Sequence, residues 1–186
     1  MKKRLGFDLI LLGDPTSGKN TQAELLSKKY QVRVFDSGTF LRKHHAKQYV
    51  SGGPAPSNLI YLFLKKIFSK LSGENIVFVG AARLKPEAVR LAAQLKKRKR
   101  DFFVLYIKLP KAEVIKRSLR RDQRAEDRDL TMINQRIKYF KDQVSKTVDY
   151  YQAMRKLKMI NGNQPIGKVA ADIQKVINDY RRSQAN

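Results

Sequence analysis

The stretch GDPTSGKNTQ, residues 13–22, combines glycines, a lysine and hydroxyl groups at a spacing that suits phosphate binding. It follows the apolar run FDLILL and precedes AELLSKKY, so it joins a predicted buried strand to a predicted helix. The spacing Gly13-x4-Gly18-Lys19 is that of a phosphate-binding P-loop. Glycines permit backbone dihedrals that other residues avoid, and successive N–H groups can then surround an anion. The stretch therefore predicts a site for the phosphates of a nucleotide.

Single residues of this loop have separate predicted roles. Lys19 can reach the outer phosphates, and the helix that begins near Gly18 adds the positive end of its dipole. The hydroxyl of Thr21 can approach a phosphate or Mg²⁺. Asn20 departs from the usual P-loop, which has Ser or Thr directly after the lysine. The residues expected to surround the phosphates are Gly13, Asp14, Pro15, Thr16, Ser17, Gly18, Lys19, Asn20 and Thr21.

Two arginines that follow neighbouring predicted strands indicate a second anion site. DSGTFLRKH places Ser37 and Gly38 at the start of a helix and Arg42 one turn into it. VGAAR places Arg83 at the end of the next strand. Either arginine alone would be interpreted as a surface residue, but their paired positions favour convergence on one phosphate.

The stretch RSLRRDQRAEDRDLTMINQR, residues 117–136, is rich in arginine and joins two predicted helices. Phosphoryl transfer spreads negative charge over several oxygens, and an arginine-rich segment over a phosphate site would stabilise that charge and exclude water. The alternative is a solvated turn in which the arginines pair with Asp127 and Asp129.

Composition limits the remaining possibilities. The 186-residue chain has no cysteine, which excludes disulfides and thiolate chemistry, and the adjacent His44 and His45 cannot form a metal site alone. No apolar run is long enough to span a membrane or to act as a signal peptide, so we expect a soluble cytoplasmic protein. The net charge of +24 favours polyanions, and KKRKR at residues 96–100 is either a solvated helix end or an RNA contact.

Alternating strand and helix signals predict an α/β fold. Five short apolar runs between helical segments are typical of a doubly wound parallel sheet with helices on both faces and ligands at the carboxyl ends of the strands. The expected strands are 5–13, 32–36, 74–80, 101–109 and 157–162. The expected helices are 18–30, 38–49, 58–71, 85–98, 111–121, 132–156 and 166–182. Ser57 is the expected N-cap of one helix, residues 181–186 are expected to fray, and residues 1–186 form one predicted domain.

These motifs, taken in order, resemble those of the adenylate kinases and, more broadly, of nucleoside monophosphate kinases of the short-lid type. GDPTSGKNTQ is similar to the family's GxPGSGKGTQ, SGTFLR to its TGDxLR, and GAARLKPEA to its GFPRTxxQA. GGPAPSNLI resembles GxxVPDxxV, which forms the far side of the monophosphate pocket, and INGNQPIGKV resembles the segment beside the adenine of ATP. The resemblance covers nearly the whole chain.

The resemblance implies the reaction ATP + AMP ⇌ 2 ADP with Mg²⁺, carried out by a monomer. It implies a monophosphate-binding segment at about 37–72 and a short lid at about 120–131. The implied ATP-binding set is residues 13–21 with Gln164, and Thr21 is the implied contact to Mg²⁺. The implied AMP-binding residues are Ser37, Gly38, Arg42, Gly80, Arg83 and Glu87. The implied catalytic residues are Lys19, Arg83, Arg121, Arg124, Arg128 and Arg136.

Several positions depart from the family pattern. Val79 stands where the family has the Asp that supports Mg²⁺ through water, and Ala81-Ala82 replace Phe-Pro before the arginine. Glu87 replaces Gln, and an ionised carboxylate suits the N–H pair of guanine at least as well as adenine. These departures leave two alternatives open. One is a kinase for GMP or another monophosphate, and the other is a catalytically weak nucleotide-binding protein with a basic surface that binds RNA.

Overall fold

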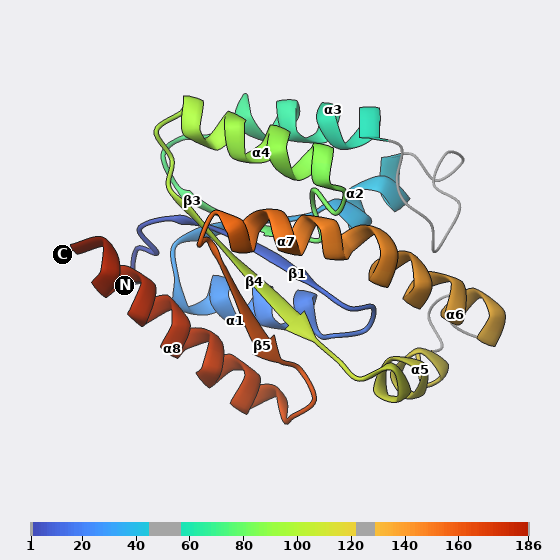
Figure 1. Cartoon of the computed structure of the whole chain (residues 1–186). Coiled ribbons are helices and arrows are strands. Elements are labelled where there is room, and N and C mark those ends of the chain that lie inside the picture. Colours follow the sequence, from blue (N-terminus) through green and yellow to red (C-terminus); the bar gives the residue numbers. More distant parts are fainter. Residues whose placement is uncertain (1, 45–56, 122–128, 186) are drawn as a thin grey trace.

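The computed structural model describes residues 2–44, 57–121 and 129–185. A five-stranded parallel sheet with the order β2-β3-β1-β4-β5 forms the centre of the molecule, as Figure 1 shows. The strands are β1 (Asp8–Gly13), β2 (Val32–Asp36), β3 (Asn75–Val79), β4 (Phe102–Lys108) and β5 (Leu157–Asn161). The predicted doubly wound α/β fold is confirmed.

Helices cover both faces of this sheet. In Figure 1, α3, α4 and α7 lie above the sheet, whereas α1 and α8 lie below it. The helices are α1 (Lys19–Lys29), α2 (Ser37–His44), α3 (Ser57–Phe68), α4 (Lys85–Lys97), α5 (Lys111–Leu119), α6 (Leu130–Tyr139), the π-helix η2 (Phe140–Val144), α7 (Ser145–Ala153) and α8 (Ile166–Ala185). None of the helices in the described residues is both long and apolar enough to cross a membrane.

The apolar strands build two cores because successive strand residues point to opposite faces of the sheet. On β1, Ile10 and Leu12 belong to the core formed with α3, α4 and α7. Leu9 and Leu11 belong to the core formed with α1 and α8. Burial on both faces explains why the strands read as continuous apolar runs in the sequence.

One close backbone approach fixes the start of the P-loop. A Cβ added at Gly13 would lie 2.4 Å from the carbonyl oxygen of Ile107 on β4, which leaves no room for any larger residue. The packing of β1 against β4 thus requires a glycine at position 13, where the P-loop spacing also has one. The loop consequently leaves the sheet at a fixed position, directly above the strand ends.

The helix expected at 132–156 is present, but its bounds were wrong and it is not α-helical throughout. It runs from Leu130 to Ala153 as α6, then five residues of π-helix from Phe140 to Val144, and then α7. A π-turn of this kind is commonly found at functional sites, and this one places Phe140 beside the candidate site.

Two smaller expectations were also wrong. The chain does not fray at residue 181, since α8 continues to Ala185 and the Arg181 Nε donates to the carbonyl oxygen of Leu5 at 3.0 Å. Ser57 is the first residue of α3 rather than the capping residue before it, and its hydroxyl donates to Glu87 on α4 at 2.9 Å. The C-terminal part of α8 and the start of α3 are both fixed by contacts to distant segments. A local sequence pattern carries no information about such contacts. Of the expected helix at 38–49, residues 45–49 lie outside the described residues.

Candidate functional site

A cavity of about 370 Å³ lies at the carboxyl ends of β1, β2 and β3. Its walls come from the P-loop, the start of α2, the end of β3 and the region around α5 and α6. The described residues that line it are Pro15, Thr16, Ser17, Gly18, Lys19, Asn20, Thr21, Asp36, Gly38, Arg42, Val79, Gly80, Arg83, Arg117, Arg120, Arg121, Arg136 and Phe140. The cavity therefore brings together residues of the two phosphate sites that the sequence predicts separately, and phosphate binding there stays a prediction.

The P-loop encloses the ammonium group of Lys19. The Lys19 Nζ donates to the carbonyl oxygens of Gly13 at 3.0 Å and Asp14 at 2.8 Å, and to the Ser17 hydroxyl at 3.2 Å. Burial, together with the positive charges of Arg83 and Arg136, lowers the pKa of Lys19 to about 7. An arriving phosphate would supply the negative charge that keeps this lysine protonated.

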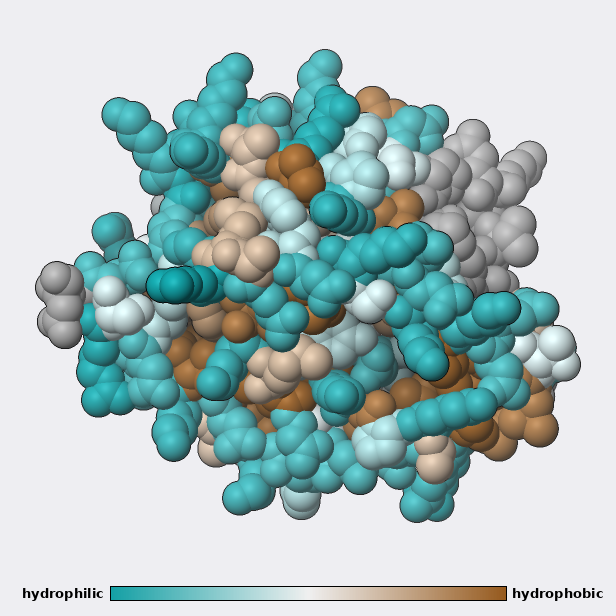
Figure 2. All heavy atoms as spheres, viewed as in Figure 1, coloured by the Kyte–Doolittle hydropathy of each residue, from teal (hydrophilic) through white to brown (hydrophobic). Residues whose placement is uncertain are grey.

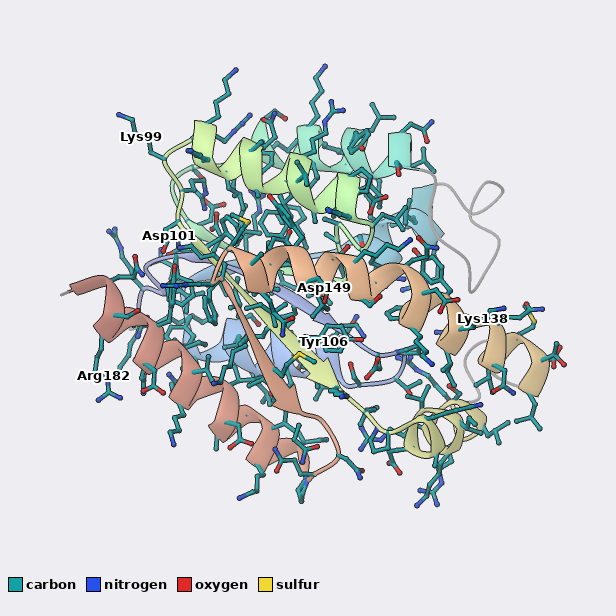
Figure 3. All side chains as sticks on the ribbon, in the orientation of Figure 1. Lys99, Asp101, Tyr106, Lys138, Asp149 and Arg182 are labelled. Carbon is teal, nitrogen blue, oxygen red and sulfur yellow. The ribbon has the colours of Figure 1, made fainter. Side chains whose placement is uncertain are left out.

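Asp14 holds the P-loop against β4. The Tyr106 hydroxyl donates to its Oδ1 at 2.6 Å, and the backbone N–H of Leu109 donates to its Oδ2 at 2.7 Å. Tyr106 lies on β4 (Figure 3), and burial together with this carboxylate raises its pKa above the usual range. The Asp14 side chain thus positions the loop. The contact with ATP that is predicted for Asp14 is a contact of its backbone and not of this side chain.

The conformation of Arg83 depends on groups from three elements. The Arg83 Nε donates to the carbonyl oxygen of Gly80 at 2.9 Å, and the guanidinium lies 5.6 Å from the ring centre of Phe140 in η2. On α7, the buried Thr147 hydroxyl donates to the Arg83 carbonyl oxygen at 2.7 Å. Ala82 has a φ of 55°, which a proline cannot adopt. The replacement of Phe-Pro by Ala81-Ala82 therefore comes with a different backbone before the arginine.

Arg42 approaches the cavity from α2. One of its terminal nitrogens donates to the Thr39 hydroxyl at 3.0 Å and lies 4.0 Å from the Asp36 carboxylate. Arg42 and Arg83 line the same cavity as Lys19, so the structure brings together the two arginines that the sequence paired. Their binding to one phosphate stays a prediction.

The arginine-rich segment contributes to the cavity from both of its ends. Arg121 and Arg136 line it, together with Arg117 and Arg120, which the site prediction had not included. The Arg117 Nε donates to Glu113 at 2.7 Å, an interaction within α5 that holds this side chain at the rim. The predicted lid arginines Arg124 and Arg128 lie outside the described residues.

Five predicted site residues among the described residues do not line the cavity, namely Gly13, Asp14, Ser37, Gln164 and Glu87. Ser37 is buried and its hydroxyl donates to the Gly80 carbonyl oxygen at 2.9 Å, which ties the start of α2 to the end of β3. The Gln164 side chain donates to the Asn161 carbonyl oxygen and to Asp172. Their predicted nucleotide contacts stay predictions, and the structure gives both residues a role in fixing the fold.

Glu87 is another of the predicted site residues that do not line the cavity. It is buried near the start of α4, where its carboxylate accepts from the Leu84 backbone N–H at 3.2 Å and from the Ser57 hydroxyl at 2.9 Å. Burial raises the pKa of Glu87 above its usual value. Both carboxylate oxygens already have a partner, so Glu87 joins α3 to α4 and its contact with a base stays a prediction.

Besides Arg117 and Arg120, the sequence analysis missed Asp36 and Phe140 in the lining and Thr147, which contacts the backbone of Arg83. Asp36 is the last residue of β2 and lies at a strand end, which is a signal that the sequence contained. Phe140 and Thr147 carry no such signal, because they reach Arg83 from a helical region more than 50 residues further along the chain.

Comparisons with known proteins identify the family of this chain. A family model described as an AAA domain matches residues 12–134. An adenylate kinase of Synechococcus sp. is 29% identical over 94% of this chain and 98% of its own length. An adenylate kinase of Parabacteroides distasonis is 30% identical over 94% of this chain and 100% of its own length. The chain belongs to the adenylate kinase family. It is an adenylate kinase-like phosphotransferase of the nucleoside monophosphate kinase class, as the sequence motifs indicated.

Proposed function

We propose that this enzyme transfers the γ-phosphoryl group of ATP to AMP and forms two molecules of ADP. The observation that carries the proposal is the shared cavity, which is lined by Lys19 of the P-loop, Arg42 of α2 and Arg83 from the segment after β3. One set of groups suits the phosphates of a donor, and the other suits the phosphate of an acceptor. The relatives that carry the name adenylate kinase support AMP as that acceptor.

Positioning and charge stabilisation account for the proposed chemistry. An oxygen of the AMP phosphate attacks the γ-phosphorus of ATP, and the bond from that phosphorus to the bridging oxygen of ADP breaks. Lys19, Arg83 and Arg136 are close enough for their charges to interact, so together they can stabilise charge on the moving group. The acceptor phosphate is already an anion near neutral pH, so no general base is needed.

The cavity also fits a magnesium ion that arrives with ATP. Mg²⁺ prefers oxygen ligands and is usually held by one or two carboxylates plus substrate phosphates. The Thr21 hydroxyl and the Asp36 carboxylate supply such oxygens in the cavity lining. The described residues contain no group of three or more His, Asp or Glu residues that would hold a metal alone. When bound, the metal neutralises part of the phosphate charge.

The geometry of Glu87 favours AMP over GMP. The case for GMP required a free carboxylate to accept both guanine N–H groups. In the structure, the carboxylate accepts from Leu84 and Ser57 instead, and burial raises its pKa. Binding of guanine by Glu87 would require the hydrogen bonds from Leu84 and Ser57 to break.

A basic surface motivates the second candidate function, a weak nucleotide-binding protein that associates with RNA. Hydrophilic residues cover much of the face shown in Figure 2, and Lys96, Lys97, Arg98 and Lys99 are exposed at the end of α4. The fifth residue of that run has an internal role, since Arg100 forms an ion pair with the fully buried Asp8 at 2.7 Å. The run is therefore partly structural, which weakens the argument for RNA.

A direct assay tests the proposal. Purified protein is mixed with ATP, Mg²⁺ and either AMP, GMP, CMP or UMP, and the diphosphate products are separated and measured. We expect the fastest turnover with AMP. Faster turnover with GMP would show that the base has been misassigned, and no turnover with any of the four would favour the RNA-associated alternative.

A further inference from the structure

Asp36 differs in charge from the other ionisable groups around the cavity. It carries the one carboxylate among the described residues of the lining. The basic side chains of that lining are Lys19, Arg42, Arg83, Arg117, Arg120, Arg121 and Arg136. A negative group in a cavity for phosphates repels the ligand unless a cation lies between them.

Hydrogen bonds keep the Asp36 carboxylate ionised. Burial alone would raise the pKa of Asp36, but donors from Thr39 and Asn20 and the charge of Arg42 hold it below its usual value. The Thr39 hydroxyl and the Asn20 amide both donate to its Oδ2 at 2.6 Å. The carboxylate is therefore charged at neutral pH and fixed in place at the cavity wall.

The sheet register places Asp36 at the level of the family's missing acid. Val79 occupies the position where the family pattern has Asp, and Asp36 pairs with Val79 across β2 and β3. Neighbouring strands lie about 4.8 Å apart, so Asp36 lies at the same end of the sheet as Val79, one strand away. Both residues line the cavity.

Asn20 connects this carboxylate to the P-loop. It stands where the family pattern has glycine, and its side chain spans the gap between the start of α1 and the end of β2. The next residue is Thr21, which also lines the cavity and whose hydroxyl is the predicted contact to Mg²⁺. Two departures from the family pattern, Asn20 and Val79, therefore both involve Asp36.

We propose that Asp36 replaces the missing acid and supports the Mg²⁺ of bound ATP together with Thr21. The inference rests on the proposed function, because it assumes that the P-loop holds ATP. Mg²⁺ keeps several water molecules and is held by few protein carboxylates, so a single acid at the cavity wall is sufficient. Asp36 then disfavours metal-free ATP and favours the magnesium complex.

A purely structural role is the competing explanation. The Asp36 Oδ1 accepts from the backbone N–H of Gly38 at 2.9 Å, which caps the start of α2. Asn caps a helix about as well as Asp does. Asp36→Asn therefore removes the charge and retains the ability to cap, so it can separate the two roles.

The experiment measures the affinity of the protein for ATP by titration calorimetry, once with excess Mg²⁺ and once with EDTA. For Asp36→Asn we expect roughly tenfold weaker binding of the magnesium complex, in line with the loss of one charge-assisted interaction. Binding of metal-free ATP should hold or become tighter because a repelling charge is gone. A structural cap would not produce opposite changes in the two titrations.

Two further variants serve as controls. Asp149→Asn makes the same change of charge on the exposed side of α7 (Figure 3) and should leave both affinities unchanged. Asp36→Glu keeps the charge and should retain more of the metal preference than Asn. Equal weakening of both titrations in Asp36→Asn, or no change in either, would overturn the inference. Failure of the unmodified protein to bind ATP at all would instead contradict the proposed function.

Discussion

The proposed donor side and the proposed acceptor side of the cavity are built in different ways. On the donor side, Lys19 is held by three oxygens of its own loop, so the geometry comes from consecutive residues. On the acceptor side, Arg83 is held by Gly80, by Phe140 in η2 and by Thr147 in α7. A local site tolerates change elsewhere in the chain, whereas a site assembled from several elements depends on all of them.

Each side keeps part of the family pattern and loses part of it. The loop keeps Gly13, Gly18 and Lys19 but has Asn20 in place of a glycine. The acceptor side loses Phe-Pro before Arg83, and the backbone there has a φ of 55° at Ala82. Distant contacts such as the one from Thr147 can fix the arginine without the local proline. Substitutions on the two sides should therefore have different effects on ATP and on AMP.

The largest effect is expected for Lys19→Met, which should abolish phosphoryl transfer. The variant removes the positive charge next to the transferring phosphate and keeps the length of the side chain. Turnover is measured with ATP and AMP, and circular dichroism checks the fold. Near-normal turnover in a folded variant would contradict the P-loop kinase mechanism.

Arg42→Ala and Arg83→Ala should each weaken AMP binding much more than ATP binding. Loss of a charge-assisted hydrogen bond costs about 1.5–3 kcal/mol, or roughly tenfold to a hundredfold in affinity. The two dissociation constants are measured for each variant. Equal weakening of ATP and AMP would mean that these arginines do not belong to the acceptor side.

The affinity for ATP should fall as the pH rises through about 7, the pKa of Lys19 in the free protein. Phosphate favours the charged lysine, and the charged form is lost above that pKa, so the loss is at most about tenfold per pH unit. Lys19→Arg keeps its charge over the whole range and is the control for ionisation of the nucleotide. Identical pH profiles for the two proteins would rule out the titration of Lys19.

Thr147→Val should weaken AMP binding severalfold and leave ATP binding unchanged. The variant keeps the shape of the buried side chain but leaves the Arg83 carbonyl oxygen without its donor, which costs about 1–3 kcal/mol of stability. Thr147→Ser keeps the hydroxyl and should bind AMP normally. If Val and Ser behave alike in AMP titrations, the contact from α7 does not position the arginine.

The smallest effect is expected for Ala82→Gly. Glycine adopts a positive φ at little cost, whereas Ala82 does so at a cost of about 1 kcal/mol. Ala81→Gly is the matched control, because Ala81 is equally buried and has no positive φ. Both variants lose a buried methyl group, so the relief of strain should leave the Tm of Ala82→Gly about 2–4 °C above that of Ala81→Gly. Equal Tm values in the two variants would argue against strain at Ala82.

The sequence predicted the parts of the fold and the site that depend on local patterns. The strands and the P-loop follow from apolar runs and from the spacing Gly13-x4-Gly18-Lys19. The roles of Thr147 and Phe140 could not be predicted, since they depend on how the region after α6 packs over the strand ends. The partners of Glu87 were missed for the same reason, because Ser57 comes from a different helix.

The most direct test of a donor site facing an acceptor site is to follow the phosphoryl group itself. ATP that carries a radioactive γ-phosphate is incubated with the protein and Mg²⁺, with and without AMP, and the labelled products are separated. We predict that the label moves into ADP and that it does so only when AMP is present. Release of the label as inorganic phosphate at the same rate with and without AMP would contradict the account.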